Sequence, residues 1–191
     1  MIAATAYGDV LSDISPDKLL TFEEVDKRLS EHFVNTFIRL LRLVPKRAES
    51  FLSVYFKKFE FSNLKTVLRG KHVNLPKEEI KRYIIPTSDV ELRLLDIYLD
   101  AADIESLIEH IPSRHVRAAL QDALPEYKTL NITVPLEVAI DKLFFSLIWT
   151  EVEKLSGIDK EEAKRHVGVE ADLQNILTCL LYTSPSPRDR G

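Results

Sequence analysis

The segment at residues 59–71 constrains the fold most strongly, because it has helical periodicity and a second copy elsewhere in the chain. Its apolar side chains recur at steps of three and four, the spacing of one helix face. Residues 172–180 repeat its order of an acid, an asparagine and aliphatic residues. The matching members are Glu60, Asn63, Leu64, Leu68 and Arg69, and then Asp172, Asn175, Ile176 and Leu180. We therefore predict a duplicated helical unit.

The duplication extends beyond this motif and divides the chain. Asp26 is echoed by Asp141 at a shift of 115 residues, and Asn63 by Asn175 at a shift of 112. In both copies a long apolar helix precedes the motif, which indicates tandem helical repeats. The predicted divisions are residues 1–84 for the first repeat, 85–168 for the second and 169–180 for the opening of a third.

Both ends of the chain depart from the helical pattern. Residues 1–20 combine glycine, proline, aspartate and serine, which is typical of a turn-rich lead-in. Residues 181–191 lose the helical spacing abruptly, and together with Cys179 and Leu180 they resemble translated sequencing-adaptor read-through. We predict a non-native, adaptor-derived tail at residues 181–191 and leave it out of the functional argument.

Start and stop signals predict helices along most of the chain. Capping boxes, in which a helix-start side chain pairs with a glutamate three residues later, occur at residues 21–24, 88–91 and 159–162. Residues 51–59 are expected to form a separate helix before the motif helix, and Gly70 to end the motif helix in the left-handed conformation. Strand signals are scarce, since glycines are few and no Asn-Gly or Asp-Gly turn occurs. The predicted fold class is all-α.

The composition is that of a soluble globular protein. The 191 residues are 45% hydrophobic and 29% charged, which suits a packed core. The longest apolar run, at residues 143–149, is far shorter than the roughly 20 residues that span a bilayer. A single cysteine excludes an internal disulfide, and the N-terminus lacks the pattern of a signal peptide. We expect a cytoplasmic setting.

The net charge of −4 conceals an uneven distribution of charge. Residues 39–82 hold twelve Lys and Arg against four Asp and Glu, whereas the rest of the chain holds fourteen against 26. A basic segment of this kind can face nucleic acid, an anionic membrane surface or an acidic protein. Its cations alternate with apolar residues at helical spacing, which is also typical of solvated helix faces.

The Gly70-Lys71 pair invites comparison with a phosphate-binding loop, but the sequence around it does not fit. That loop, G-x-x-x-x-G-K-[ST], needs glycines that free successive backbone N–H groups. Lys65 stands at the position of the first glycine and His72 at that of the hydroxyl residue. The pair is therefore interpreted as the end of a helix, and no nucleotide hydrolysis is expected from this chain.

Other catalytic and metal-binding patterns are not found either. His110 and His115 are five residues apart, which does not place two imidazoles on one helix face. The adjacent acids at residues 23–24, 78–79 and 161–162 suit the first turns of helices, where negative charge stabilises the helix dipole. We predict no catalytic residue, no metal and no cofactor.

Asn63 and Asn175 are the polar residues that most need an explanation. Asparagine is a poor former of helix interiors, so each is expected to be present for a hydrogen bond. That bond could go to a neighbouring helix end or to the acid one turn earlier, Glu60 or Asp172. Local capping within the motif helix is the preferred expectation.

Residues 63–71, followed by residues 75–80, resemble the central-stalk C-type component of archaeal A-type ATPases, whose family includes the d-type component of the vacuolar ATPase. In that family an acid, an Asn-Leu pair and a closing Leu-Arg recur in three helical repeats. Leu181 stands where the second closing arginine is expected, and the family's N-terminal helices are missing. The resemblance covers nearly all of residues 1–180 and implies a fragment.

This resemblance implies an all-helical, funnel-like socket that has no catalysis of its own. The subunit would couple the rotating shaft of the soluble head to the membrane proteolipid ring, on the cytoplasmic side, for ATP-linked proton or sodium transport. Shaft and ring would be its partners, without nucleic acid or small-molecule substrate. Structural or interface roles are implied for Glu60, Asn63, Leu64, Leu68, Arg69, Lys71, Asp172 and Asn175.

Two other interpretations stay open at this point. One is a helical adaptor or scaffold unrelated to rotary ATPases, and the other is a helical nucleic-acid-binding protein that uses residues 39–82. Steeply salt-dependent binding to duplex DNA or RNA would favour the second. A third copy of acid-x-x-Asn-Leu in the downstream reading frame would favour the rotary stalk.

Overall fold

The computed structural model describes residues 21–183, and this part of the chain folds into eight α-helices without a strand, which confirms the all-α prediction. The predicted lead-in at residues 1–20 and the last eight residues of the predicted tail lie outside the described residues. The helices are α1 (Phe22–Leu41), α2 (Lys46–His72), α3 (Lys77–Arg82), α4 (Asp89–Asp100), α5 (Ile104–His110), α6 (Arg114–Leu130), α7 (Val134–Lys154) and α8 (Gly157–Thr183).

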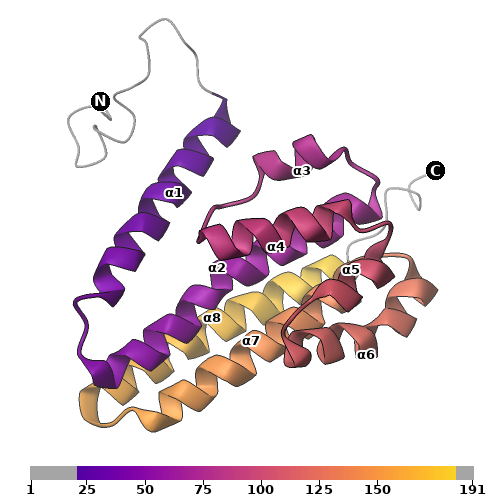
Figure 1. The fold of residues 1–191 in the computed structure, drawn as a ribbon. Coiled ribbons are helices and arrows are strands. Elements are labelled where there is room, and N and C mark those ends of the chain that lie inside the picture. The colour runs from indigo at the N-terminus through magenta and orange to yellow at the C-terminus, as the bar shows by residue number, and fades with distance from the viewer. Residues whose placement is uncertain (1–20, 184–191) are drawn as a thin grey trace, which may run out of the picture.

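Three long helices, α2, α7 and α8, form the centre of the molecule (Figure 1). Helix α7 packs against both α2 and α8, and α6 folds back against α7. Helix α4 packs on α2, and α5 joins α4 to α6. Helix α1 diverges from the body and contacts α2, where the ring of Phe33 meets that of Phe59 and the ring of Phe37 meets that of Phe56.

The core follows from a regular apolar stripe on α7. Every fourth residue of this helix is apolar and at most 5% exposed, which is the spacing that keeps side chains on one helix face. Burying one such side chain stabilises the fold by about 1.5–3 kcal/mol, so this stripe is a main source of packing energy. The stripe consists of Leu136, Ile140, Phe144, Ile148 and Val152.

The first predicted capping box is confirmed, and the other two are not complete. Thr21 accepts from the backbone N–H of Glu24 at 3.2 Å, and its own N–H donates to the Glu24 carboxylate at 3.1 Å. Ser88 accepts from the N–H of Glu91, but the Glu91 carboxylate turns toward the core. The box at residues 159–162 is wrong, because Asp159 already lies inside the first turn of α8.

The expectation that Gly70 ends the motif helix is wrong, as is the separate helix at residues 51–59. Helix α2 runs unbroken from Lys46 to His72, and the left-handed residue after it is Asn74, with φ 55°. Gly70 is needed for close packing instead. A Cβ atom at this position would lie 2.5 Å from the side chain of Ile80, so only glycine lets α3 approach α2 this closely.

The helix bounds support an internal repeat with an offset of 112 residues. Shifting α1 by 112 gives residues 134–153, and α7 spans Val134–Lys154. Shifting α2 by the same amount gives residues 158–184, and α8 spans Gly157–Thr183. The repeat divisions and the funnel-like shape remain predictions. In the part of the chain that the structure describes, no helix is long and apolar enough to cross a membrane.

Candidate functional site

A row of cations on α2 faces acidic side chains on α7 and α8, and we call this arrangement the seam. Three cations, Lys58, Lys65 and Arg69, are seven and four residues apart, so they lie on one face of α2. The facing residues of α7 and α8 are each four apart and also share a face. They are Glu137 and Asp141 on α7, and Glu170 and Gln174 on α8.

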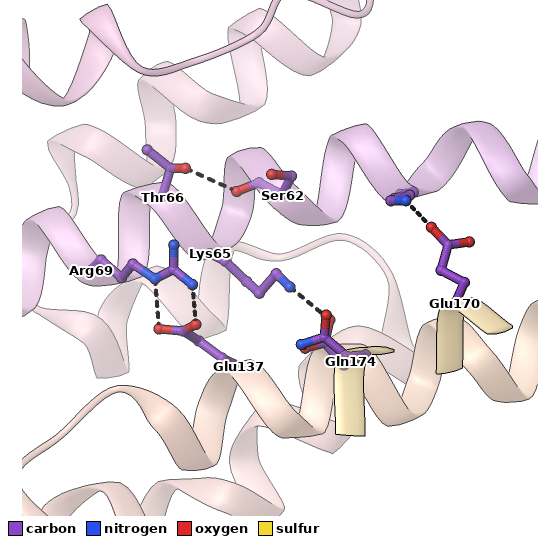
Figure 2. A network of polar contacts seen from close by, with 9 residues as sticks. Ser62, Lys65, Thr66, Arg69, Glu137, Glu170 and Gln174 are labelled. Carbon is purple, nitrogen blue, oxygen red and sulfur yellow. Dashed lines mark hydrogen bonds and ion pairs between the residues drawn. The ribbon is translucent and has the colours of Figure 1, made fainter. Parts of the chain in front are cut away.

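Each seam cation binds an acid on another helix (Figure 2). Nζ of Lys65 lies 2.7 Å from Oδ1 of Asp141, whose second oxygen accepts from Gln174 at 2.7 Å. Arg69 donates from Nε to Glu137 at 2.8 Å and pairs with its other oxygen through a second nitrogen. Lys58 pairs with Glu170. The seam therefore ties α2, α7 and α8 together at three points.

The seam carboxylate of Glu137 is held in its charged form. Burial alone would raise the pKa of Glu137, but hydrogen bonds from Arg69 and Thr133, with the charge of Arg69, outweigh burial and lower it. The hydrogen bond to Glu137 raises the pKa of Arg69 in turn. Burial, followed by the charge of Lys65, lowers the pKa of Lys58. Breaking one partner would thus leave the other poorly compensated.

Asn63 forms a second polar site, which we call the asparagine clamp, with Ile85, Thr87 and Glu91. Its amide nitrogen donates to the Ile85 carbonyl at 2.7 Å and to Glu91 at 2.8 Å, and its oxygen accepts from the Ile85 N–H at 2.9 Å. The Thr87 hydroxyl donates to the other oxygen of Glu91. The local-capping expectation for Asn63 is therefore wrong, because its partners lie on the α3–α4 connector and the first turn of α4.

The clamp is dry, and this changes the acidity of Glu91. Asn63 is 1% exposed and Glu91 is 8% exposed. Burial raises the pKa of Glu91 to about 7, the negative charge of Glu60 raises it further, and the hydrogen bond from Asn63 opposes both. Glu60 itself is half-buried, and burial raises its pKa. Glu60 and Glu91 both line a cavity of about 270 Å³, beside Tyr98 and His115.

The remaining motif residues of α2 serve packing and helix capping. Leu64 and Leu68 are buried in the core. Nζ of Lys71 donates to the carbonyl oxygens of Leu99 at 3.1 Å and Ala101 at 2.5 Å, so it caps the C-terminal end of α4. All motif candidates of the first copy thus contact α4, α7 or the core except Glu60, which faces the cavity.

The second copy of the motif lies in a different environment. Asp172 and Asn175 are both exposed on α8, and Ile176 and Leu180 are 57% and 56% exposed. Only the opposite face of α8 packs inward, through Glu170 and Gln174 of the seam. The structure therefore does not bring the two copies together into one site.

The acidic half of the seam and the glutamate of the clamp were not predicted from the sequence. A signal for the seam was present, because Lys65 and Arg69 are four apart on one helix and Glu137 and Asp141 are four apart on another. No comparable signal pointed from Asn63 to Glu91, which lies 28 residues away. Among residues 21–183, no group of three or more His, Cys, Asp or Glu could hold a metal ion.

Comparison with known proteins identifies relatives of the whole chain. Residues 1–182 match the family model described as ATP synthase (C/AC39) subunit. The C-type component of the A-type ATP synthase of Methanobrevibacter smithii is 29% identical over 172 residues, which cover 89% of this chain and 42% of that protein. The proteins of the same name from Methanocaldococcus jannaschii and Haloferax volcanii are 23% and 25% identical, over 94% and 82% of this chain. No solved structure matches.

The chain spans less than half the length of these relatives, since it covers 42%, 45% and 44% of them. The family match nevertheless extends over both helical motifs and over all the helices of the seam and the clamp. It confirms the resemblance drawn from the motif residues and excludes an unrelated helical adaptor. The chain belongs to the ATP synthase (C/AC39) subunit family.

Proposed function

We propose that the full-length protein to which this chain belongs is a non-catalytic central-stalk rotor subunit of an A- or V-type ATPase; we call that protein the whole subunit. It would couple the rotating shaft of the soluble head to the membrane proteolipid ring, and so link ATP turnover to proton or sodium transport. The observation that carries the proposal is the family match over residues 1–182, together with a seam that joins three long helices.

A coupling subunit must transmit torque without its helices sliding past one another. Apolar packing alone is non-directional, so it resists separation of helices better than it resists sliding. The seam adds directional contacts at three places along α2, between Lys58 and Arg69, which are about 16 Å apart along the helix axis. These ion pairs are partly or largely shielded on their acidic side, which makes them stronger than fully exposed pairs.

The proposed partners are the shaft subunits and the proteolipid ring, and the proposed location is peripheral, on the cytoplasmic side of the membrane. Within the basic stretch, Arg69 and Lys71 bind internal acceptors, so they serve the fold of the protein itself. The stretch also holds Arg39, Arg42 and Lys46 around the turn between α1 and α2, where Arg39 and Lys46 are exposed. We assign the contact with acidic partner loops to this turn.

The test is a reconstitution of the host ATPase in vesicles with and without the whole subunit. Measurements of ATP hydrolysis and ion pumping give the number of ions moved per ATP. We expect hydrolysis by the head without pumping when the whole subunit is absent, and restored pumping when it is added. Full pumping in its absence, or ATP hydrolysis by the purified protein alone, would contradict the proposal.

A charge swap tests the contribution of the seam. Lys65→Asp alone places two carboxylates together, so pumping per ATP should fall. Lys65→Asp with Asp141→Lys restores opposite charges and should recover part of the loss. Arg82→Asp, at an exposed cation outside the seam, is the matched control and should leave coupling unchanged.

A further inference from the structure

The outward face of α8 carries apolar side chains that contact solvent along three turns of the helix. We call it the α8 face and define it by Leu173, Asn175, Ile176 and Leu180. Leu173 is 56% exposed and Ile176 is 57% exposed, and a polar residue, Asn175, stands between them. The opposite side of α8 is already occupied by Val167, Glu170 and Gln174, which pack toward α7 and α2.

The offset of 112 residues gives each member of the α8 face an equivalent on α2. The α2 residues have the same kinds of side chain, three apolar and one asparagine, but they are fully enclosed. The exposed fractions of the α2 residues are 8% for Phe61, 1% for Asn63, 5% for Leu64 and 0% for Leu68. The same pattern is therefore a core surface on one helix and a bare surface on the other.

On α2 this surface is covered by α4 and by the connector before it. Asn63 fixes the position of α4, because its amide bonds the Ile85 backbone and the Glu91 carboxylate. Leu95 and Leu99 of α4 complete the cover and are 3% and 8% exposed. The covering element is thus a helix with a serine N-cap and a carboxylate in its first turn.

We propose that the α8 face is the docking site for a later helix of the same whole subunit, equivalent to α4, which presents a first-turn carboxylate to Asn175. Shifting α4 by 112 residues gives residues 201–212, which lie beyond the 191 residues of this chain. The relatives supply room for such a helix, since this chain covers only 42–45% of them. The Asn175 amide would donate to the carboxylate as the Asn63 amide donates to Glu91.

The first experiment measures whether the α8 face is covered in the whole subunit. Single cysteines at Leu173→Cys and Ile176→Cys, in a Cys179→Ser background, are labelled with a maleimide in the 191-residue chain and in the whole subunit. We expect labelling in the whole subunit to be slower by about tenfold or more, since exposure then requires local opening. Ile158→Cys, at a position 77% exposed, is the control and should label equally in both proteins.

The second experiment tests the carboxylate. Asn175→Ala and Asn175→Asp are placed in both proteins, and thermal unfolding is followed. In the whole subunit both should lower the Tm, Asn175→Asp more strongly because it opposes two negative charges, while neither should matter in the 191-residue chain. Equal labelling in both proteins overturns the proposal, as does an Asn175→Asp variant as stable as the parent. Protection that disappears on dilution to a monomer would overturn it too, and would assign the face to a second copy. Neither readout depends on ATP or on coupling.

Discussion

The guanidinium of Arg69 near the end of α2 donates two hydrogen bonds to the carboxylate of Glu137 in the first turn of α7, 68 residues later in the chain. This contact joins the first copy of the motif to the helix that carries the core stripe. Arg69 is 57% exposed at its side chain, whereas Glu137 is only 9% exposed. The two partners therefore contribute unequally, and the loss of Arg69 should cost more than a surface ion pair.

A double-mutant cycle measures this pair. Arg69→Met leaves the Glu137 carboxylate shielded without its guanidinium, so the free energy of unfolding should fall by about 1–3 kcal/mol. With Glu137→Gln the second change should cost less, because the coupling in the partly exposed pair is about 1 kcal/mol. Urea unfolding gives both values. Arg165 and Glu162, exposed at 76% and 60%, form the control pair, and a coupling there as large as in the seam would refute the assignment.

Asn63→Ala should destabilise the chain, because it leaves the buried Glu91 carboxylate and the Ile85 backbone without their partner. The expected cost is about 1–3 kcal/mol in the free energy of unfolding, measured by urea titration. Asn175→Ala in the same chain is the matched control, since Asn175 is exposed, and it should change stability by less than about 0.5 kcal/mol. Similar losses from both variants would argue against a special role for the clamp.

The clamp also makes stability depend on pH in an identifiable direction. The pKa of Glu91 is about 7 in the folded chain and 4.5 in its ordinary state, so the folded chain holds a proton that the unfolded chain releases between these values. Stability from this group is therefore complete below pH 4.5 and is lost as the pH rises to about 7, by up to about 3 kcal/mol.

Glu91→Gln isolates that effect, because glutamine keeps an oxygen for the Asn63 amide but does not titrate. The difference in unfolding free energy between the parent and Glu91→Gln should change across pH 4.5–7 and level off above it. Urea unfolding at a series of pH values gives the curve. A pH-independent difference would show that Glu91 titrates normally. Glu137 acts in the opposite sense, since its lowered pKa removes stability only as the pH falls below its ordinary value.

Two glycines inside helices should respond in opposite directions to alanine. Gly70→Ala places a Cβ atom 2.5 Å from Ile80 and should cost about 1–3 kcal/mol through overpacking, measured by thermal or urea unfolding. Gly168→Ala meets no atom within 4 Å and should stabilise α8 by about 0.5–1 kcal/mol through helix propensity.

Ile80→Val provides the internal check on Gly70. Valine lacks the Cδ1 atom, one of the two Ile80 atoms that lie 2.5 Å from the added Cβ, so Gly70→Ala should cost less in that background. A loss of equal size in both backgrounds would mean that the cost comes from another source than contact with Ile80.

Local rules predicted the helices well where the information lies within a few residues. The Thr21 capping box formed as its own spacing required, and the apolar stripe of α7 emerged directly from residues four apart. The all-α class and the motif residues that placed the chain in its family also came from patterns of this range. Such features depend on helix periodicity and on hydrogen bonds within one turn, which are properties of the chain itself.

The tertiary structure alone decided how the polar residues are used. Asn63 bonds residues 22 and 28 positions away rather than Glu60, and Gly70 stays helical because Ile80 packs against it. The cations of residues 39–82 that had suggested an external partner include Lys65 and Arg69, which bind acids 76 and 68 residues away. These outcomes could not be predicted from the sequence, because a buried polar group takes whatever partner the packing of distant helices brings to it.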